Sequence, residues 1–375
     1  MNASTVSIGI TLGTRPEAIK LAPVIQQFRR FETIQAHVVL TGQHREMVEQ
    51  VMQLFELSAD QDLKIMREGQ TLSDVTCGSL QGLEKIFKQI HPSMVLVQGD
   101  TTTAFAAALA AFYQKIPIGH VEAGLRSNDL FNPYPEEANR RLISQLTQLH
   151  FAPTQAAVEN LRHSGVTGEI HHTGNTVIDA LLEMAQRQPE CPVPGLEWGN
   201  YRVLLATVHR RENWGEPLRN IAQGFRLILD HFPDTALLLP LHRNPTVREP
   251  MQAFFGNHPR AFLCESLDYA QLVGAIQHCY LLLTDSGGLQ EEAPSLGKPV
   301  LVLRATTERQ EAIAAGTAKL VGVDPKQIVA AASQLLSDPT TYQAMAGAIN
   351  PFGDGYAAQR IVKVIERYLL GEVRA

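Results

Sequence analysis

Acidic and imidazole side chains stand where several apolar runs of this sequence end. Asp100 ends the run Val95–Asp100, and Glu122 directly follows Ile116–Val121. His209 comes just after another apolar run. Because parallel α/β sheets bind ligands at the carboxyl ends of their strands, these side chains could transfer protons on one bound ligand. Asp100 could instead only cap a helix, and a single histidine is usually structural.

A further pair of charges, Glu136 and Arg140, begins a predicted helix after Pro135. Because they are four residues apart, they could form only an exposed helical ion pair, worth roughly 0.3–0.5 kcal/mol. Each acid taken singly thus has an ordinary explanation. Three acids and an arginine at predicted strand ends and helix starts are harder to explain by folding alone, and together they indicate a catalytic site.

Two glycine-containing loops favour a phosphate-bearing ligand. One begins at Gly13 after the first apolar run, and the other begins at Asp285 after Tyr280–Thr284. Glycine lets the backbone approach a ligand closely, and the free N–H groups at a helix start attract anions. The first loop lacks the GxGxxG spacing of dinucleotide sites, and both could be ordinary strand–helix turns. The candidate ligand-binding residues of these loops are Arg15, Lys20, Ser286, Gly287, Gly288 and Glu292.

Short apolar runs alternate with amphipathic stretches along the chain, which predicts parallel sheets covered by helices on both faces. Strands are expected at Val6–Leu12, His37–Thr41, Met94–Gln98, Ile116–Val121, Leu149–Ala152, Arg202–Thr207, Ala236–Pro240, Arg260–Cys264, Tyr280–Thr284 and Pro299–Leu303. Helices are expected at Pro16–Phe31, Leu72–Ile90, Thr102–Gln114, Glu136–Leu149, Leu218–His231, Ile328–Leu336 and Tyr356–Leu370. The proline-rich segment Gln188–Gly195 separates two series of strands, and we expect it to be a surface excursion near the domain junction rather than a flexible linker. The predicted fold class is therefore α/β, with two doubly wound domains and a cleft between them.

Composition narrows the class of protein further. The chain has 375 residues, of which 45% are hydrophobic. This length predicts about two domains, and the hydrophobic content is sufficient to give each a buried core. Its net charge of −6 argues against sequence-independent binding to nucleic acid or to an anionic membrane. We recognise no signal peptide, membrane span, metal-ligand spacing or GxSxG motif, and expect a cytoplasmic protein. The four scattered cysteines are expected to be buried free thiols; they are Cys77, Cys191, Cys264 and Cys279.

Long blocks of this sequence resemble the bacterial non-hydrolysing UDP-N-acetylglucosamine 2-epimerases. The blocks are GTRPEAIKLAP, TGQHREM, GDTTTAFAAALAAFY, GHVEAGLRS, PEEANR, HRRE, LTDSGGLQEEAPSLGKPVLVLR, TTERQEA and NPFGDG. The resemblance implies a GT-B architecture with two Rossmann-like domains and an interdomain cleft. It places residues 1–173 and the C-terminal helix, residues 356–375, in the first domain, and residues 174–355 in a UDP-binding second domain. A homodimer is also the family expectation.

The resemblance implies that UDP-GlcNAc and UDP-ManNAc are interconverted, which supplies ManNAc units for surface polysaccharide. Anti elimination of UDP would give 2-acetamidoglucal, and UDP would then add back. Asp100, Glu122 and Glu136 match the family's essential acids and are assigned jointly to proton transfer. Arg140 and His209 match the remaining catalytic pair and are expected to stabilise the departing pyrophosphate. The positions that match the UDP site are Arg15, Lys20, Ser286, Gly287, Gly288, Glu292 and Arg309.

Neither NAD nor a metal is expected, because the implied intermediate is an alkene rather than a ketone. Some family members are activated by a second UDP-GlcNAc, bound partly through the segment that matches residues 43–46. Gln43, Arg210 and His242 match that allosteric site. However, Gly69 stands where allosteric members can carry arginine, and Val208 replaces the usual glycine before His-Arg-Arg-Glu. The sequence therefore predicts a weakened or rearranged allosteric site.

Three other functions would use similar residues. A hydrolysing epimerase would let water trap the intermediate and would release ManNAc and UDP. A GT-B glycosyltransferase would need an acceptor. A non-catalytic UDP-sugar sensor would bind the nucleotide sugar without turnover, which the three acids argue against.

Overall fold

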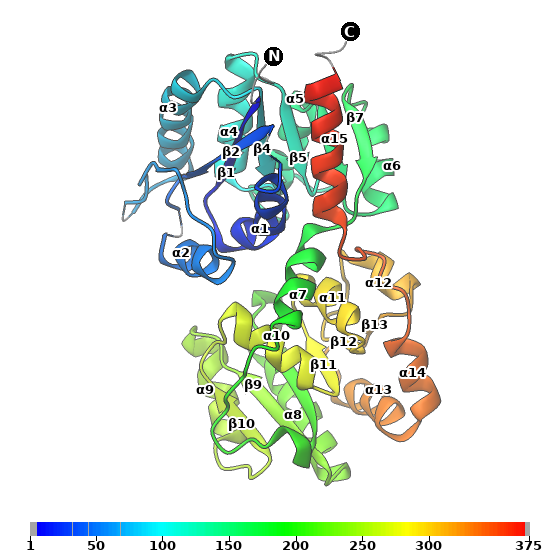
Figure 1. Ribbon diagram of the computed structural model, residues 1–375. Coiled ribbons are helices and arrows are strands. Elements are labelled where there is room, and N and C mark those ends of the chain that lie inside the picture. The colour runs from blue at the N-terminus through cyan, green and yellow to red at the C-terminus, as the bar shows by residue number, and fades with distance from the viewer. Residues whose placement is uncertain (1–5, 32, 44, 68, 372–375) are drawn as a thin grey trace. The chain divides into compact units, whose positions relative to one another are not determined.

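The chain folds into two compact units, shown in Figure 1. The computed structural model describes residues 6–31, 33–43, 45–67 and 69–371, and of residue 45 only the backbone. Unit 1 comprises Met1–Ala180 and Phe352–Ala375, and unit 2 comprises Leu181–Pro351. The predicted domain boundaries followed residues 173 and 355, whereas the compact units divide after Ala180 and Pro351. Residues 1–5 and 372–375 of the predicted first domain lie outside the described residues.

Unit 1 is built on a parallel sheet with the strand order β3-β2-β1-β4-β5-β6-β7. Its strands are β1 (Val6–Leu12), β2 (Ile34–Leu40), β3 (Gln61–Asp62), β4 (Met94–Gln98), β5 (Ile118–Val121), β6 (Leu149–Ala152) and β7 (Glu169–His172). The predicted strands β1, β4 and β6 have the predicted bounds. The short strands β3 and β7 carry polar residues and were not predicted, because their apolar signal is weak.

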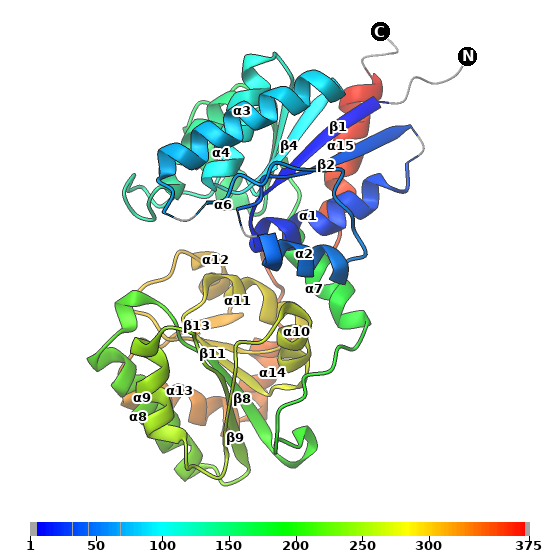
Figure 2. The ribbon, with the colours of Figure 1, turned by 90° about the vertical axis from the view of Figure 1, so that its left-hand side faces the viewer.

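Helices cover both faces of this sheet. In Figure 2, α3 and α4 lie on one face, and α1 and α15 lie on the other. The helices that begin in unit 1 are α1 (Arg15–Phe28), α2 (Arg45–Leu54), α3 (Leu72–Ile90), α4 (Thr102–Tyr113), α5 (Glu136–Leu146), α6 (Gln155–His163), α7 (Thr176–Gln186) and α15 (Ala357–Gly371). The division between the units falls within α7.

Unit 2 repeats the same winding with the parallel order β10-β9-β8-β11-β12-β13. Its strands are β8 (Arg202–Thr207), β9 (Thr235–Pro240), β10 (Ala261–Cys264), β11 (Leu281–Thr284), β12 (Val300–Val302) and β13 (Ala318–Leu320). Its helices are η1 (Trp198–Asn200), η2 (Arg211–Asn213), α8 (Glu216–His231), α9 (Pro245–Phe255), α10 (Tyr269–His278), α11 (Gly287–Glu292), η3 (Ala293–Leu296), α12 (Gln310–Ala314), α13 (Pro325–Ser337) and α14 (Pro339–Ala346). The predicted α/β class with two doubly wound domains is thus confirmed.

The proline-rich segment Gln188–Gly195 belongs to unit 2 and follows soon after the division at Ala180, close to the predicted junction. A Cβ on Gly274 would lie 2.3 Å from the carbonyl oxygen of Pro189, so the segment packs tightly against α10. One smaller prediction needs correction. All four cysteines are free, but Cys77 is exposed, so the expectation of buried thiols is wrong there. In the part of the chain that the structure describes, no helix has the length and apolarity that crossing a membrane requires.

The last helix is tied to unit 1 through Asp179. Its carboxylate accepts hydrogen bonds from the backbone N–H groups of Ala357 (3.2 Å) and Ala358 (2.8 Å), which open α15. These N–H groups have no partner inside the helix, so a carboxylate there caps it. Burial raises the pKa of Asp179 to about 6, although both hydrogen bonds act in the opposite direction.

This raised pKa makes stability depend on pH in a defined direction. Because the folded-state pKa lies above the ordinary value of 3.8, the contribution of Asp179 is greatest at low pH and is lost as the pH rises through about 6. Between pH 4 and pH 7, wild type should therefore lose up to roughly 3 kcal/mol of unfolding free energy relative to Asp179→Asn. Urea titrations over this range measure the difference.

Asp74 in the first turn of α3 supplies the control. Hydrogen bonds from Thr71 lower its pKa, so its contribution changes little between pH 4 and pH 7 and Asp74→Asn should stay nearly parallel to wild type through this window. Parallel pH profiles for wild type and Asp179→Asn would contradict the prediction.

Candidate functional site

Glu122 lies immediately after β5 and is held by three side chains of unit 1. Lys20 Nζ lies 2.6 Å and 2.7 Å from its two carboxylate oxygens, and Asn175 Nδ2 donates to Oε1 at 3.1 Å. Gln98 Nε2 donates to Oε2. Glu122 also adopts a left-handed backbone conformation, with φ of 64°, which costs a non-glycine residue about 1–2 kcal/mol. The chain therefore maintains a strained backbone in order to hold this carboxylate in place.

Asp100 lies in the turn that follows β4 and forms an ion pair with Arg140 of α5. Arg140 Nη2 lies 2.5 Å from Asp100 Oδ2, and Asn139 Nδ2 donates to the Asp100 carbonyl oxygen at 2.9 Å. Burial raises the pKa of Asp100, the charge of Arg140 opposes that rise, and the nearby charge of Glu122 adds to it. Unit 1 therefore brings Asp100, Glu122, Lys20 and Arg140 into one electrostatically coupled group.

Glu136 does not pair with Arg140, contrary to the ordinary explanation of their spacing. Arg140 Nη1 instead lies 3.3 Å from Glu137 Oε2, and Glu137 is fully buried. Arg141 Nε reaches the other oxygen of Glu137 at 2.7 Å. Glu136, at the first turn of α5, is half-buried and forms no hydrogen bond or ion pair with any described residue. Its carboxylate is therefore unpaired among the described residues, although its charge at the helix start is favourable to the helix dipole.

The Gly13 loop is fixed by Glu17, which sequence reasoning missed. The Glu17 carboxylate accepts from the backbone N–H groups of Gly13 (3.0 Å) and Thr14 (2.7 Å) and from the Thr101 hydroxyl (2.7 Å). Burial raises the pKa of Glu17, while these hydrogen bonds act to lower it. A Cβ on Gly13 would lie 2.3 Å from Thr41 Oγ1, so glycine is required for this packing. The sequence predicts that the N–H groups of this loop bind a phosphate. In the structure, the N–H groups of Gly13 and Thr14 donate to the Glu17 carboxylate instead.

In unit 2, His209 forms a dyad with Asp285. His209 Nδ1 lies 2.9 Å from Asp285 Oδ1, and Asp285 also accepts from the backbone N–H groups of His209 and Arg210, each at 2.9 Å, and from Asn213 Nδ2 at 3.0 Å. Burial acts to raise the pKa of Asp285, but the hydrogen bonds and charge of His209 and the backbone N–H groups hold it below its ordinary value. A buried carboxylate on Nδ1 leaves Nε2 of the half-exposed imidazole for a ligand.

Basic side chains surround the second glycine loop of unit 2. Arg309 Nε lies 2.5 Å from Glu291 Oε1, and Arg210 Nη2 lies 3.1 Å from Glu308 Oε1. A Cβ on Gly287 would lie 2.8 Å from Glu308 Oε1, so a larger residue there would displace the Glu308 carboxylate. Burial acts to raise the pKa of Glu308, yet the arginines around it lower this pKa to about 2. Of the other predicted loop residues, Ser286 is half-buried, Gly288 is exposed and Glu292 is buried.

The remaining predicted residues are distributed between the units. Arg15 is exposed on the first turn of α1, and Gln43 Oε1 accepts from the Thr103 hydroxyl at 3.4 Å, both in unit 1. His242 of unit 2 is exposed, and its ring stacks on that of His209 with centroids 6.1 Å apart. Gly69 has φ of 74°, so arginine would be strained there. His44 and the side chain of residue 45 lie outside the described residues.

The sequence missed four residues that hold the candidate catalytic groups. They are Gln98, Glu137, Asn175 and Asp285. Asp285 had a usable signal, because it follows a mainly apolar strand just as Asp100 and Glu122 do. Asn175 had none, because it reaches Glu122 from 53 residues further along the chain. Among the described residues, no group of three histidine, cysteine or acidic side chains could hold a metal ion.

Comparisons with known proteins identify the family of this chain. The family model described as UDP-N-acetylglucosamine 2-epimerase matches residues 26–366. The UDP-N-acetylglucosamine 2-epimerase of Bacillus subtilis is 47% identical over 352 residues, covering 94% of this chain and 92% of that protein. The crystal structure of the Neisseria meningitidis UDP-GlcNAc 2-epimerase bound to UDP-GlcNAc is 46% identical with a TM-score of 0.88, covering 96% of this chain and 100% of that one. The Staphylococcus aureus MnaA–UDP structure is 43% identical with a TM-score of 0.88, covering 97% of each chain.

The hydrogen bonds of two histidines predict opposite neutral tautomers. His209 Nδ1 donates to Asp285, so neutral His209 should carry its proton on Nδ1. The control is His242, whose Nδ1 accepts the backbone N–H of Asn244 at 3.2 Å and which should carry its proton on Nε2. Nitrogen NMR of ¹⁵N-histidine-labelled protein reads both tautomers, with His209→Gln and His242→Gln for assignment. An Nε2–H tautomer for His209 would contradict the dyad.

Proposed function

The chain belongs to the UDP-N-acetylglucosamine 2-epimerase family, and we propose that it is a non-hydrolysing member that interconverts UDP-GlcNAc and UDP-ManNAc. The observation that carries this proposal is the coupled group of Asp100, Glu122 and Arg140 at the carboxyl edge of the unit 1 sheet. Removal of the C2 proton of the sugar needs a positioned carboxylate, because this proton is only weakly acidic. Departure of UDP needs positive charge, because the leaving diphosphate is an anion.

The proposed reaction begins with an anti elimination. A carboxylate takes the proton from C2, the electron pair of the C2–H bond forms the C1–C2 double bond, and the C1–O bond to UDP breaks. The product is 2-acetamidoglucal with UDP as the leaving group. A proton then returns to C2 on the opposite face while UDP adds back to C1. No electron leaves the system, so the balance needs no oxidant or reductant.

The hydrogen bonds of unit 1 suggest how its three acids divide the work. Lys20, Gln98 and Asn175 engage both oxygens of Glu122. Glu136 has no bonding partner among the described residues, and Asp100 is bonded there through Oδ2 only. We therefore assign proton transfer at C2 to Asp100 and Glu136, and we assign to Glu122 the orientation and electrostatic tuning of Asp100. Burial that raises the pKa of Asp100 makes it a stronger base.

Unit 2 is proposed to bind the nucleotide. His209 Nε2, oriented by Asp285, would protonate or hydrogen-bond the departing diphosphate together with Arg140. Ser286, Gly287, Gly288 and Arg309 would hold phosphate oxygens, Glu292 would accept from ribose hydroxyls, and Arg15 and Lys20 of unit 1 would add charge. The N-acetylglucosamine nucleotide in the Neisseria meningitidis structure supports a UDP-sugar as the ligand.

Two further parts of the proposal rest on the family resemblance. Gln43, Arg210 and His242 would form a weakened allosteric site for a second UDP-GlcNAc, consistent with a backbone conformation at Gly69 that disfavours arginine. The enzyme would act as a cytoplasmic homodimer that supplies ManNAc units for surface polysaccharide. The exposed apolar side chains of Phe112 and Tyr113 on α4 are compatible with a subunit interface.

Incubation with UDP-GlcNAc in deuterated water tests the reaction. Proton NMR should show UDP-ManNAc appearing, the C2 proton replaced by deuterium, and UDP remaining at a trace level. Steady accumulation of free UDP with ManNAc would identify a hydrolysing epimerase. A requirement for an acceptor before any change at C1 would identify a glycosyltransferase.

Substitution of the acids tests their division of labour. Asp100→Asn and Glu136→Gln should each lower turnover by about 10²–10⁴-fold, because neither amide can accept the C2 proton. Lys20→Met should lower turnover less and raise the KM, since Glu122 would lose an orienting partner. Glu169→Gln on exposed β7 is the control and should match wild type. Circular dichroism must show that each variant is folded. Full activity in Asp100→Asn would exclude this assignment.

A further inference from the structure

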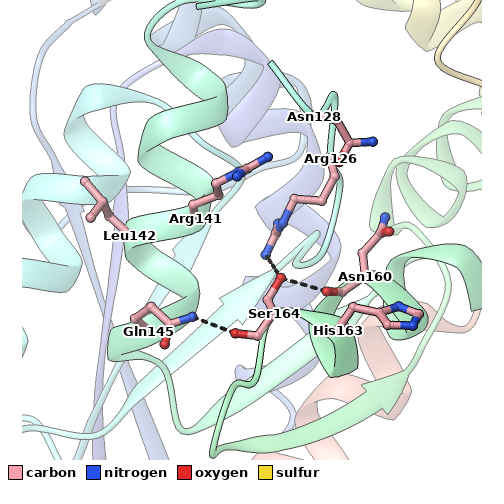
Figure 3. A pocket seen from close by; sticks show the side chains of 8 residues that line it. All are labelled: Arg126, Asn128, Arg141, Leu142, Gln145, Asn160, His163 and Ser164. Atoms are coloured by element: carbon pink, nitrogen blue, oxygen red, sulfur yellow. Dashed lines mark hydrogen bonds between the residues drawn. The ribbon is translucent and has the colours of Figure 1, made fainter. Parts of the chain in front are cut away.

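Unit 1 contains a cavity of about 480 Å³ that none of the proposed catalytic residues lines. It lies between α5 and α6, and Figure 3 shows the side chains around it. The lining is rich in nitrogen donors, with two arginines, one histidine and three amides among eight residues. These are Arg126, Asn128, Arg141, Leu142, Gln145, Asn160, His163 and Ser164. A cavity with this lining favours a hydrogen-bonding anion over an apolar molecule.

Arg126 is a half-buried cation without a carboxylate partner. It donates to the Leu125 carbonyl at 2.7 Å and to the hydroxyls of Ser144 and Ser164, both at 3.2 Å. It forms no ion pair with any residue that the structure describes. Burial lowers the pKa of Arg126, and the nearby Glu137 only partly opposes this. A cation held in partial burial by hydroxyl and carbonyl groups alone is electrostatically incomplete.

Arg141 offers a second guanidinium to the same cavity. Its Nε is bonded to Glu137, but its two terminal nitrogens have no hydrogen bond within the described residues. The side chain is 41% exposed, so a ligand in the cavity can reach it. The imidazole of His163 and the amide of Asn128 are likewise without partners in the described part of the chain.

The local charges do not balance. Arg126, Arg140 and Arg141 carry three positive charges around the fully buried Glu137, and Asp100 supplies only one more negative charge through Arg140. One positive charge is therefore left over on the side of the cavity. A bound anion would neutralise this excess in a partly buried setting, where such an interaction is stronger than in water.

We propose that this cavity binds a small phosphate-bearing molecule through Arg126 and Arg141. Two guanidinium groups match the planar, bidentate recognition of phosphate oxygens better than they match a neutral ligand. The cavity extends beyond one phosphate group, and the amides of Asn128, Gln145 and Asn160 line the remainder. These amides can donate to and accept from hydroxyl groups, so a sugar phosphate is the class of ligand that best fits the lining.

Glu137 links the cavity to the candidate catalytic group. It shares its two oxygens between Arg141, which lines the cavity, and Arg140, which pairs with Asp100. When a phosphate draws Arg141 away, Glu137 attracts Arg140 more strongly and the Asp100–Arg140 pair loosens. This step rests on the proposed function, because it assigns catalysis to Asp100. Binding to the cavity itself does not depend on that function.

Calorimetric titration with inorganic phosphate, and then with glucose 6-phosphate, at low ionic strength tests binding. Arg141→Gln should weaken binding at least tenfold, because one of two phosphate-binding guanidinium groups is lost. Arg126→Gln should also weaken phosphate binding at least tenfold, in protein that circular dichroism shows to be folded. Arg162→Gln is the matched control, because Arg162 is an exposed arginine of α6 outside the cavity. The affinity of this variant for phosphate should stay within twofold of wild type.

Other variants and ligands separate this cavity from the proposed nucleotide site. Arg309→Gln in unit 2 should leave the affinity of the cavity for phosphate unchanged. Loss of all phosphate binding in Arg309→Gln, or unchanged binding in Arg141→Gln, overturns the proposal. Acetate should bind at least ten times more weakly, and equal affinity for acetate overturns the preference for phosphate.

The link to catalysis has its own readout. At saturating UDP-GlcNAc, glucose 6-phosphate should change kcat at least twofold in wild type and in Arg162→Gln, and should have no effect in Arg141→Gln. Binding with an unchanged kcat would refute the link through Glu137 and leave the binding site supported. An absence of any epimerisation would refute the proposed function, and the calorimetric result would still stand.

Discussion

A carboxylate buried beside the loops at the carboxyl edge of a parallel sheet must be fully hydrogen-bonded, and in each unit one such carboxylate fixes the loops of the site. Glu17 joins the loop after β1 to the loop after β4 by accepting from Gly13, Thr14 and Thr101. Asp285 joins the loop after β8 to the loop after β11 by accepting from His209, Arg210 and Asn213. Hydrogen bonds to charged groups contribute about 1.5–3 kcal/mol each, whereas an unpaired buried charge would cost several kcal/mol. The loops that carry the chemistry are therefore ordered before any ligand binds.

This constraint explains which parts of the fold the sequence predicts. Strands such as β4 and β8 are continuous apolar runs because both faces of a parallel sheet are covered, and their ends could be read directly. The edge strands β3 and β7 carry polar residues, because an edge position has only one neighbouring strand. Periodicity alone does not detect such strands. The compact units divide within α7, where an uninterrupted helix gives no change of composition to mark a boundary.

The candidate site also contains some residues that the sequence predicts and others that it does not. Asp100, Glu122 and His209 are recognisable because each follows an apolar strand, where the strand ends of a parallel sheet meet. Their partners are not recognisable, since Asn175 and Glu137 reach them from other elements across long or helical spacings. The expected Glu136–Arg140 pair shows the limit of spacing rules. The i+4 geometry permits that pair, but Arg140 is drawn instead to Asp100 and to the buried Glu137.

The attachment of α15 to unit 1 has a consequence for biosynthesis. Unit 1 consists of the residues up to Ala180 and the residues from Phe352 onward. The whole of unit 2 is therefore translated between these two segments of unit 1. Until then α1 lacks the apolar face of α15, which includes Ile361, Ile365 and Leu369. The nascent chain must therefore leave the ribosome with an uncovered helix layer on its first domain. Closure of that layer is a late event in maturation, and it makes the N-terminal body dependent on successful synthesis of everything that follows.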